Sequence, residues 1–172
     1  LAGEGGLIAL HYISSTGVFG TPGNESVRIG RLYEHDDIHI GLETSHIGYV
    51  QTKWVAEKMV WLAKERGLPV GIFRCGMVMG DSRDGRTNVR DFPSLLIKTC
   101  IELEAVYRLH KLDNFIPVDV ASRAIVHISR QPRIFDRVFH VVNPHHFEFA
   151  KLWEYVRSLG YRLEELSYEE WL

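Results

Sequence analysis

Short apolar runs alternate along this chain with longer stretches in which apolar residues recur at helical spacing. Leu7–Ser14 is nearly continuous in apolar character and ends in a cluster of hydroxyl residues. A run of this length with such flanks is typical of a strand buried on both faces of a parallel sheet. Val70–Phe73 and Val138–Val142 are runs of the same kind, and residues 115–118 are extended in character. We interpret the three apolar runs, Leu7–Ser14, Val70–Phe73 and Val138–Val142, as strands.

Helical patterns lie between and after these strands. The first spans about residues 49–66, and Gly67 and Pro69 end it. Asp91 and Asp119 are predicted N-caps of two further helices, and residues 147–159 form an amphipathic segment ended by a glycine. The apolar face of the first helix is formed by Val50, Trp54, Met59 and Trp61. The apolar face of the last helix is formed by Phe149, Leu152, Trp153 and Val156. Strand, helix and strand in this order predict an α/β fold.

Composition narrows the function classes. The chain has 172 residues and a formal net charge of −2, with no dense block of Lys and Arg, so we expect no nucleic-acid partner. Its apolar runs fall short of the roughly 20 residues of a membrane span. Two lone cysteines, Cys75 and Cys100, predict a reducing, cytoplasmic location. His35, His39 and His46 lack the spacing of a helical metal site, and we expect no metal.

Tyr49 and Lys53 are the strongest candidates for chemistry. They lie four residues apart, which on a helix puts both side chains on one face. A positive charge beside a phenol favours its ionised form and suits it to proton transfer near neutral pH. Such pairs are also common on helix surfaces with no catalytic role, and that alternative stays open. Glu57 could pair with Lys53, and an exposed pair would contribute about 0.3–0.5 kcal/mol.

Hydroxyl groups mark the end of the first predicted strand, in Ser14, Ser15 and Thr16. Open α/β sheets place their chemistry at the carboxyl ends of the strands, although a Ser/Thr turn that satisfies its own backbone would look the same. Neighbouring side chains on a strand point to opposite faces, so Ser15 and Thr16 should not share one cleft. Gly76 and Gly80, after the second strand, allow a ligand to approach the backbone closely.

These features, taken in order, resemble the extended short-chain dehydrogenase/reductase superfamily. Within it the chain is most similar to the thioester reductase domains of nonribosomal peptide and polyketide synthases and of α-aminoadipate reductase. Tyr12–Gly20 resembles the family's catalytic hydroxyl strand, Gly48–Glu57 its Tyr-x-x-x-Lys helix, and Arg74–Ser82 the segment beside the nicotinamide. More specific to the subgroup are Gly85–Asn88, Asp91–Phe92, Pro117–Asp119 and Phe139–Pro144.

The resemblance implies a site, a cofactor and a partner. It assigns catalysis to Ser15, Tyr49 and Lys53. It implies NADPH, rather than NADH, as the cofactor. The substrate would be an acyl or peptidyl thioester on a phosphopantetheinyl carrier protein, released as an aldehyde or reduced further to an alcohol. The residues implied to contact the cofactor are Ser14, Tyr49, Lys53, Cys75, Gly76, Met77 and Val78.

Two departures from the family pattern matter. Cys75 stands where the family usually has proline, and the glycine-rich turn that cradles the pyrophosphate is absent. The family would place that turn before Leu1, so we expect a partial Rossmann-like, doubly wound parallel sheet whose amino-terminal half is a missing partner. Residues 1–80 would be the second half of a nucleotide-binding domain. Residues 81–172 would combine a small substrate-binding region with the last Rossmann elements.

Three alternative functions remain open. A nucleotide-sugar epimerase or dehydratase shares the Ser, Tyr and Lys, but does not account for the segment from Asp81 to Asp91. A redox-silent relative would cyclise its substrate by forming a carbon–carbon bond, and the intact Tyr49 and Lys53 argue against it. The chain could also be a carrier-binding or acyl-binding module that has no activity of its own.

Overall fold

The computed structural model describes residues 8–20, 32–39, 47–107, 112–131 and 134–171. The chain forms two compact units. The first contains Leu1–Gly76 and Ala121–Val142, and the second contains Met77–Val120 and Asn143–Leu172. The predicted functional regions, 1–80 and 81–172, remain an interpretation, because the chain passes between the compact units after residues 76, 120 and 142.

A three-stranded parallel sheet forms the centre of the first unit. Its order is β1 (Leu10–Ser15), β2 (Val70–Cys75) and β7 (Arg137–Val141). In the register, Ser15 lies beside Cys75, and Cys75 lies beside Val141, so the carboxyl ends of the three strands are aligned. β2 is buried along its whole length because it has a neighbour on each side. The predicted α/β class is confirmed, and a strand is found at each of the three predicted runs. Leu7, the first residue of the first run, lies outside the described residues.

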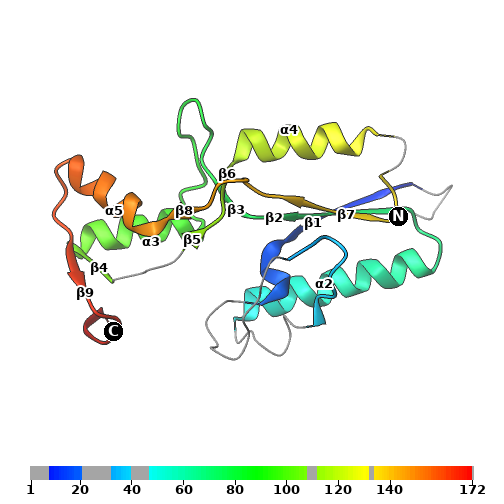
Figure 1. Ribbon diagram of the computed structural model, residues 1–172, viewed down its shortest axis with the longest axis horizontal. Helices are drawn as coiled ribbons and strands as arrows, with labels where there is room; N and C mark the ends of the chain where they lie inside the picture. The colour runs from blue at the N-terminus through cyan, green and yellow to red at the C-terminus, as the bar shows by residue number, and fades with distance from the viewer. Residues whose placement is uncertain (1–7, 21–31, 40–46, 108–111, 132–133, 172) are drawn as a thin grey trace. The chain divides into compact units, whose positions relative to one another are not determined.

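Two long helices flank this sheet in Figure 1, α2 (Gly48–Glu65) on one side and α4 (Val118–Ser129) on the other. The short helix η1 (Thr16–Phe19) continues directly from β1. On α2, Val60 packs against Val70 and Ile72 of β2. The predicted apolar face of α2 was wrong at Met59, whose side chain is 65% exposed.

Two other predictions need correction. β1 is not buried on both faces, since Ile13 is 43% exposed among the described residues. Asp119 is not an N-cap, because α4 begins at Val118 and Asp119 lies in its first turn. The Asp119 carboxylate accepts hydrogen bonds from the backbone N–H of Ser82 at 2.9 Å and from the Ser82 hydroxyl at 3.0 Å.

The second unit is built from short strand pairs and helices around its own apolar core. Asp91 caps α3 (Phe92–Glu102) as predicted, accepting a hydrogen bond from the Ser94 N–H at 3.0 Å. Gly160, at φ 95°, follows the end of α5 (Phe149–Ser158). The strand pairs are β3 (Met77–Met79) with β6 (Phe115–Pro117), β4 (Ala105–Tyr107) with β9 (Glu164–Leu166), and β5 (Leu112–Asp113) with β8 (Phe147–Glu148). The helices are α3 (Phe92–Glu102), α5 (Phe149–Ser158) and α6 (Tyr168–Trp171). The core residues are Cys100, Val106, Phe149, Trp153, Val156 and Leu163. Across the part of the chain that is described, no helix has both the length and the apolar character needed to cross a bilayer.

Candidate active site

Ser15 occupies the last position of β1 and caps η1. Its backbone is extended, and its Oγ accepts a hydrogen bond from the Gly17 N–H at 3.1 Å. That bond uses an oxygen lone pair, so the hydroxyl hydrogen of Ser15 can still be donated. A β-carbon at Gly17 would lie 3.3 Å from this oxygen and 3.6 Å from Val50 Cγ2. The glycine therefore gives room to the hydroxyl at the strand end.

The neighbouring hydroxyls have other partners. Thr16 Oγ1 donates to the Cys75 carbonyl at 3.3 Å, a backbone partner on the neighbouring strand β2 and not in its own turn. Ser14 Oγ donates to Glu57 in the interior at 2.5 Å. The Ser14 hydroxyl hydrogen is thus already used, and the predicted contact between Ser14 and a cofactor stays a prediction.

Lys53 links α2 to the strand that carries Ser15. Its Nζ donates to the Ile13 carbonyl at 3.1 Å and lies 5.6 Å from the centre of the Tyr12 ring. Tyr49, one turn earlier on α2, is 59% exposed. β1 and α2 thus bring the three predicted catalytic residues, Ser15, Tyr49 and Lys53, into one region of the first unit.

Tyr12 of β1, for which the sequence suggested no role, lies in the same region, beneath Lys53. Partial burial raises the pKa of its phenol, and the charges of Glu57 and Tyr49 raise it further. Tyr12 therefore remains a neutral phenol at neutral pH and packs beneath the Lys53 ammonium. The alternation of side chains along β1, which puts Tyr12 and Ser14 on the same face, could have indicated this position.

The predicted cofactor contacts after β2 divide between the two units. Cys75 and Gly76 belong to the first unit, and Met77 and Val78 begin the second within β3. The Gly76 N–H donates to the Val141 carbonyl at 3.0 Å. Burial raises the pKa of the Cys75 thiol, and the nearby charge of Lys53 lowers it by less. Cys75 is therefore a packed, neutral thiol at the end of the strand.

The predicted exposed pair between Glu57 and Lys53 is wrong, because Glu57 pairs with Arg74 in the interior. It is fully buried, and it binds Arg74 through Nη2 at 2.7 Å and Nε at 3.1 Å. The Arg74 side chain is 2% exposed. Leaving one partner of such a buried pair without the other typically costs about 3–5 kcal/mol.

Further groups surround the Arg74 guanidinium. Its centre lies 4.7 Å from the Phe19 ring, and its Nη1 donates to the Glu34 carbonyl at 3.3 Å. The Glu34 carboxylate accepts a hydrogen bond from the backbone N–H of His140 at 2.7 Å. Burial, and then the charge of Arg74, lowers the pKa of the His140 imidazole. The sequence does contain a sign of this cluster, because Arg74 is the one charged residue in an otherwise apolar strand and a buried charge needs a partner.

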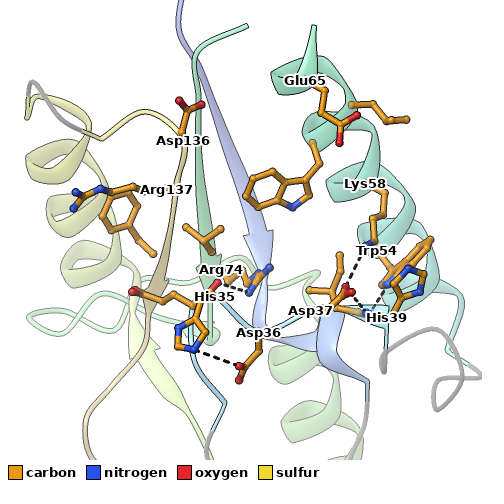
Figure 2. A pocket seen from close by; sticks show the side chains of 16 residues that line it. His35, Asp36, Asp37, His39, Trp54, Lys58, Glu65, Arg74, Asp136 and Arg137 are labelled. Carbon is orange, nitrogen blue, oxygen red and sulfur yellow. Dashed lines mark hydrogen bonds and ion pairs between the residues drawn. The ribbon is translucent and has the colours of Figure 1, made fainter. Parts of the chain in front are cut away.

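A cavity of about 1020 Å³ lies elsewhere in the first unit, between α2, residues 34–39 and β7. Figure 2 shows Trp54 and Lys58 of α2 facing the segment from His35 to His39, with Arg74 between them and Arg137. Lys58 pairs with Asp37 at 3.2 Å. None of Ser15, Tyr49 and Lys53 lines this cavity. The assignment of the chemistry to the ends of the strands, away from this cavity, remains a prediction.

A parallel sheet with a hydroxyl at a strand end, packed against a helix that carries Tyr-x-x-x-Lys, is the arrangement found in the extended short-chain dehydrogenase/reductase superfamily. Residues 1–125 match the family NAD_binding_4, described as "Male sterility protein", and the chain belongs to that family. It is 34% identical over 173 residues to the glycine betaine reductase ATRR of Emericella nidulans. The match covers 100% of this chain and 13% of that protein.

Solved structures of reductase domains resemble the chain over nearly its whole length. The terminal R domain of the myxalamid PKS-NRPS pathway has a TM-score of 0.88 and 35% identity, covering 99% of this chain and 42% of that one. A thiolation-reductase di-domain of an archaeal nonribosomal peptide synthetase has a TM-score of 0.71 and 28% identity, covering 96% and 36%. The dTDP-glucose 4,6-dehydratase of Bacillus anthracis, at 20% identity, shares the fold.

Proposed function

We propose that this chain carries the catalytic groups of an NADPH-dependent thioester reductase, which releases a carrier-bound acyl or peptidyl chain as an aldehyde. The observation that carries the proposal is the bond from Lys53 Nζ to the Ile13 carbonyl. It fixes the Tyr-x-x-x-Lys helix against the strand that ends at Ser15. The similarity to the myxalamid R domain, at 35% identity, supports thioester reduction within the wider class.

The residues present fit the nicotinamide half of the cofactor. Lys53 has two ammonium hydrogens left after its bond to Ile13, and they suit the ribose hydroxyls. Gly76 has no side chain to block a ligand at the end of β2, next to Cys75. Contacts with Cys75, Met77 and Val78 remain part of the proposal. When bound, the reduced nicotinamide supplies a hydride. NADPH rather than NADH remains part of the proposal.

Ser15 and Tyr49 handle the oxygen of the thioester carbonyl in this proposal. Both hydroxyls donate hydrogen bonds to that oxygen as negative charge develops on it. Tyr49 then transfers its proton to the oxygen, a role worth typically 10²–10⁴-fold in rate. Lys53 lies one helical turn after Tyr49 on α2 and supplies positive charge to this region. Collapse of the resulting hemithioacetal releases the thiol and the aldehyde.

The proposed partner is a carrier protein that presents the thioester on a phosphopantetheine arm. The archaeal neighbour, a thiolation-reductase di-domain, supports a carrier of this kind. A second candidate function, nucleotide-sugar epimerisation or dehydration, is supported by the fold shared with dTDP-glucose 4,6-dehydratase. That likeness has 20% identity, against 35% for the myxalamid R domain, so we favour thioester reduction.

The test is an assay of the chain, together with any sequence encoded before Leu1, with an acyl-phosphopantetheinyl carrier protein and NADPH. We expect loss of absorbance at 340 nm and an aldehyde identified by mass. UDP- and dTDP-sugars serve as the competing substrates, and product mass also detects a redox-silent cyclisation. Binding of the carrier protein with no NADPH oxidation would refute the proposal and favour a binding module.

A further inference from the structure

We infer that Ser14, Glu57 and Arg74 form a positioning cluster that sets the proposed catalytic groups relative to one another. The inference rests on the proposed function, since it assigns a role to residues around that site. The three side chains are 4%, 0% and 2% exposed, and of the three only Arg74 lines the cavity of Figure 2, which holds none of Ser15, Tyr49 and Lys53. They act on the site through their neighbours in the chain.

Each residue of the cluster lies next to a proposed catalytic group or to the strand that carries one. Ser14 directly precedes Ser15 on β1, and Glu57 lies one helical turn after Lys53 on α2. Ser14 Oγ donates to Glu57 Oε2 at 2.5 Å. This bond and the bond from Lys53 Nζ to the Ile13 carbonyl join the same strand to the same helix, one turn apart. Together they fix how far α2 can slide or rotate along β1.

The cluster also contacts η1, which begins immediately after Ser15. Arg74 binds Glu57 on one side, and its guanidinium lies 4.7 Å from the centre of the Phe19 ring on the other. Phe19 is itself buried in a cluster with Val18 and Ile38. Arg74 therefore connects α2 to η1, whose Gly17 N–H orients the Ser15 hydroxyl. The cluster thus touches elements on both sides of that hydroxyl.

The energetics of the buried pair favour the same role. A buried ion pair often adds little net stability over apolar residues of the same size, so stability alone is a weak account of this one. Geometric specificity is a better account, because an error of about 1 Å in the placement of reacting groups can cost about a hundredfold in rate. A cluster that bonds to β1, α2 and the segment around Glu34 is suited to this task.

Two variants test the cluster without burying an unpaired charge. Ser14→Ala removes one hydrogen bond and leaves the ion pair intact. The triple variant Ser14→Ala, Glu57→Met, Arg74→Met replaces the whole cluster with apolar side chains of similar size. The matched control is Val60→Ala, which destabilises α2 through its apolar contact with Val70 and Ile72 and leaves all three polar side chains of the cluster in place. All are made in the chain with any sequence encoded before Leu1.

We expect kcat for thioester reduction to fall about tenfold in Ser14→Ala and about a hundredfold in the triple variant. KM for the carrier-bound substrate should stay within about threefold, because binding is not what the cluster supplies. The control should keep kcat at temperatures where it is folded. Hydrogen exchange followed by mass spectrometry should show faster exchange in the triple variant, in peptides covering Leu10–Phe19 and Gly48–Glu57. In the control, exchange in the peptide covering Leu10–Phe19 should be unchanged.

The outcomes separate this inference from the proposed function. Unchanged kcat and unchanged exchange in the triple variant would overturn the positioning role. An equal loss of kcat in Val60→Ala would also overturn it, because general destabilisation would then explain the effect. A wild-type protein without thioester reduction, but with the expected exchange pattern, would refute the proposed function and support the link between strand and helix.

Discussion

At the scale of single residues, the proposed chemistry depends on two oxygen atoms. Tyr49→Phe deletes the proposed proton donor from a side chain that is 59% exposed, so the fold should be unaffected. We expect turnover to fall at least about a hundredfold, the usual contribution of general acid catalysis. NADPH binding, measured by fluorescence titration, should be preserved. Turnover near that of the wild type would remove Tyr49 from the mechanism.

Ser15 and Thr16 are adjacent hydroxyls with different partners, and substitution can rank them. Ser15→Ala should lower kcat by about 10²–10³, as for one lost oxyanion donor. Thr16→Val, which removes the bond to the Cys75 carbonyl, should have a much smaller effect. Steady-state kinetics of the two variants side by side decides the matter. A larger loss in Thr16→Val would reverse the assignment.

At the scale of elements, the cap of α3 offers a direct test. The Asp91 carboxylate accepts a hydrogen bond from the Ser94 N–H at 3.0 Å. Asp91→Ala should lower the free energy of unfolding by about 1 kcal/mol, because a helix N–H loses its partner. Urea denaturation followed by circular dichroism measures the change. Glu154→Ala, at an exposed position on α5, is the control and should change the free energy by less than about 0.5 kcal/mol.

The elements themselves were readable from the sequence because burial imposes a period on it. Val70–Phe73 was predicted as a strand from its apolar run, and β2 contains it. Asp91 and Gly160 marked helix ends by chemistry that acts within a few residues. Glu57 was misplaced because local spacing to Lys53 suggested a partner, whereas its real partner, Arg74, is distant in sequence. Pairings of this kind depend on the tertiary fold.

The candidate site was predictable to a similar extent. Tyr49 and Lys53 were found from their spacing, which any helix imposes. Ser15 was distinguished from Ser14 and Thr16 only by resemblance to a family, because three adjacent hydroxyls look alike in a sequence. The structure separates them by their hydrogen bonds, since Ser14 donates to Glu57 and Thr16 donates to the Cys75 carbonyl.

At the scale of the whole molecule, the position of β1 predicts association. In the order β1-β2-β7, β1 has a described neighbour on one side. Ile8, just before it, is 63% exposed. An apolar strand with an unpaired edge invites pairing with another chain. We expect this 172-residue chain, expressed alone, to associate rather than persist as a monomer.

Light scattering with intact mass tests this expectation. Ile8→Lys should reduce association, because a charged side chain beside an edge strand discourages pairing. Co-expression with any sequence encoded before Leu1 should have the same effect by supplying a strand. A monomer that unfolds cooperatively without such help would show that the edge is already protected.

The two compact units interleave along the chain, and this has a consequence for exchanging parts between related enzymes. The second unit is made of two segments, 77–120 and 143–172, separated by a stretch that belongs to the first unit. A chimaera that imports the second unit from a relative therefore needs two grafts. Residues 121–142, which contain most of α4 and all of β7, must keep the sequence of the recipient chain. A single crossover at residue 77 would also replace β7, a strand whose register with β2 aligns Cys75 with Val141.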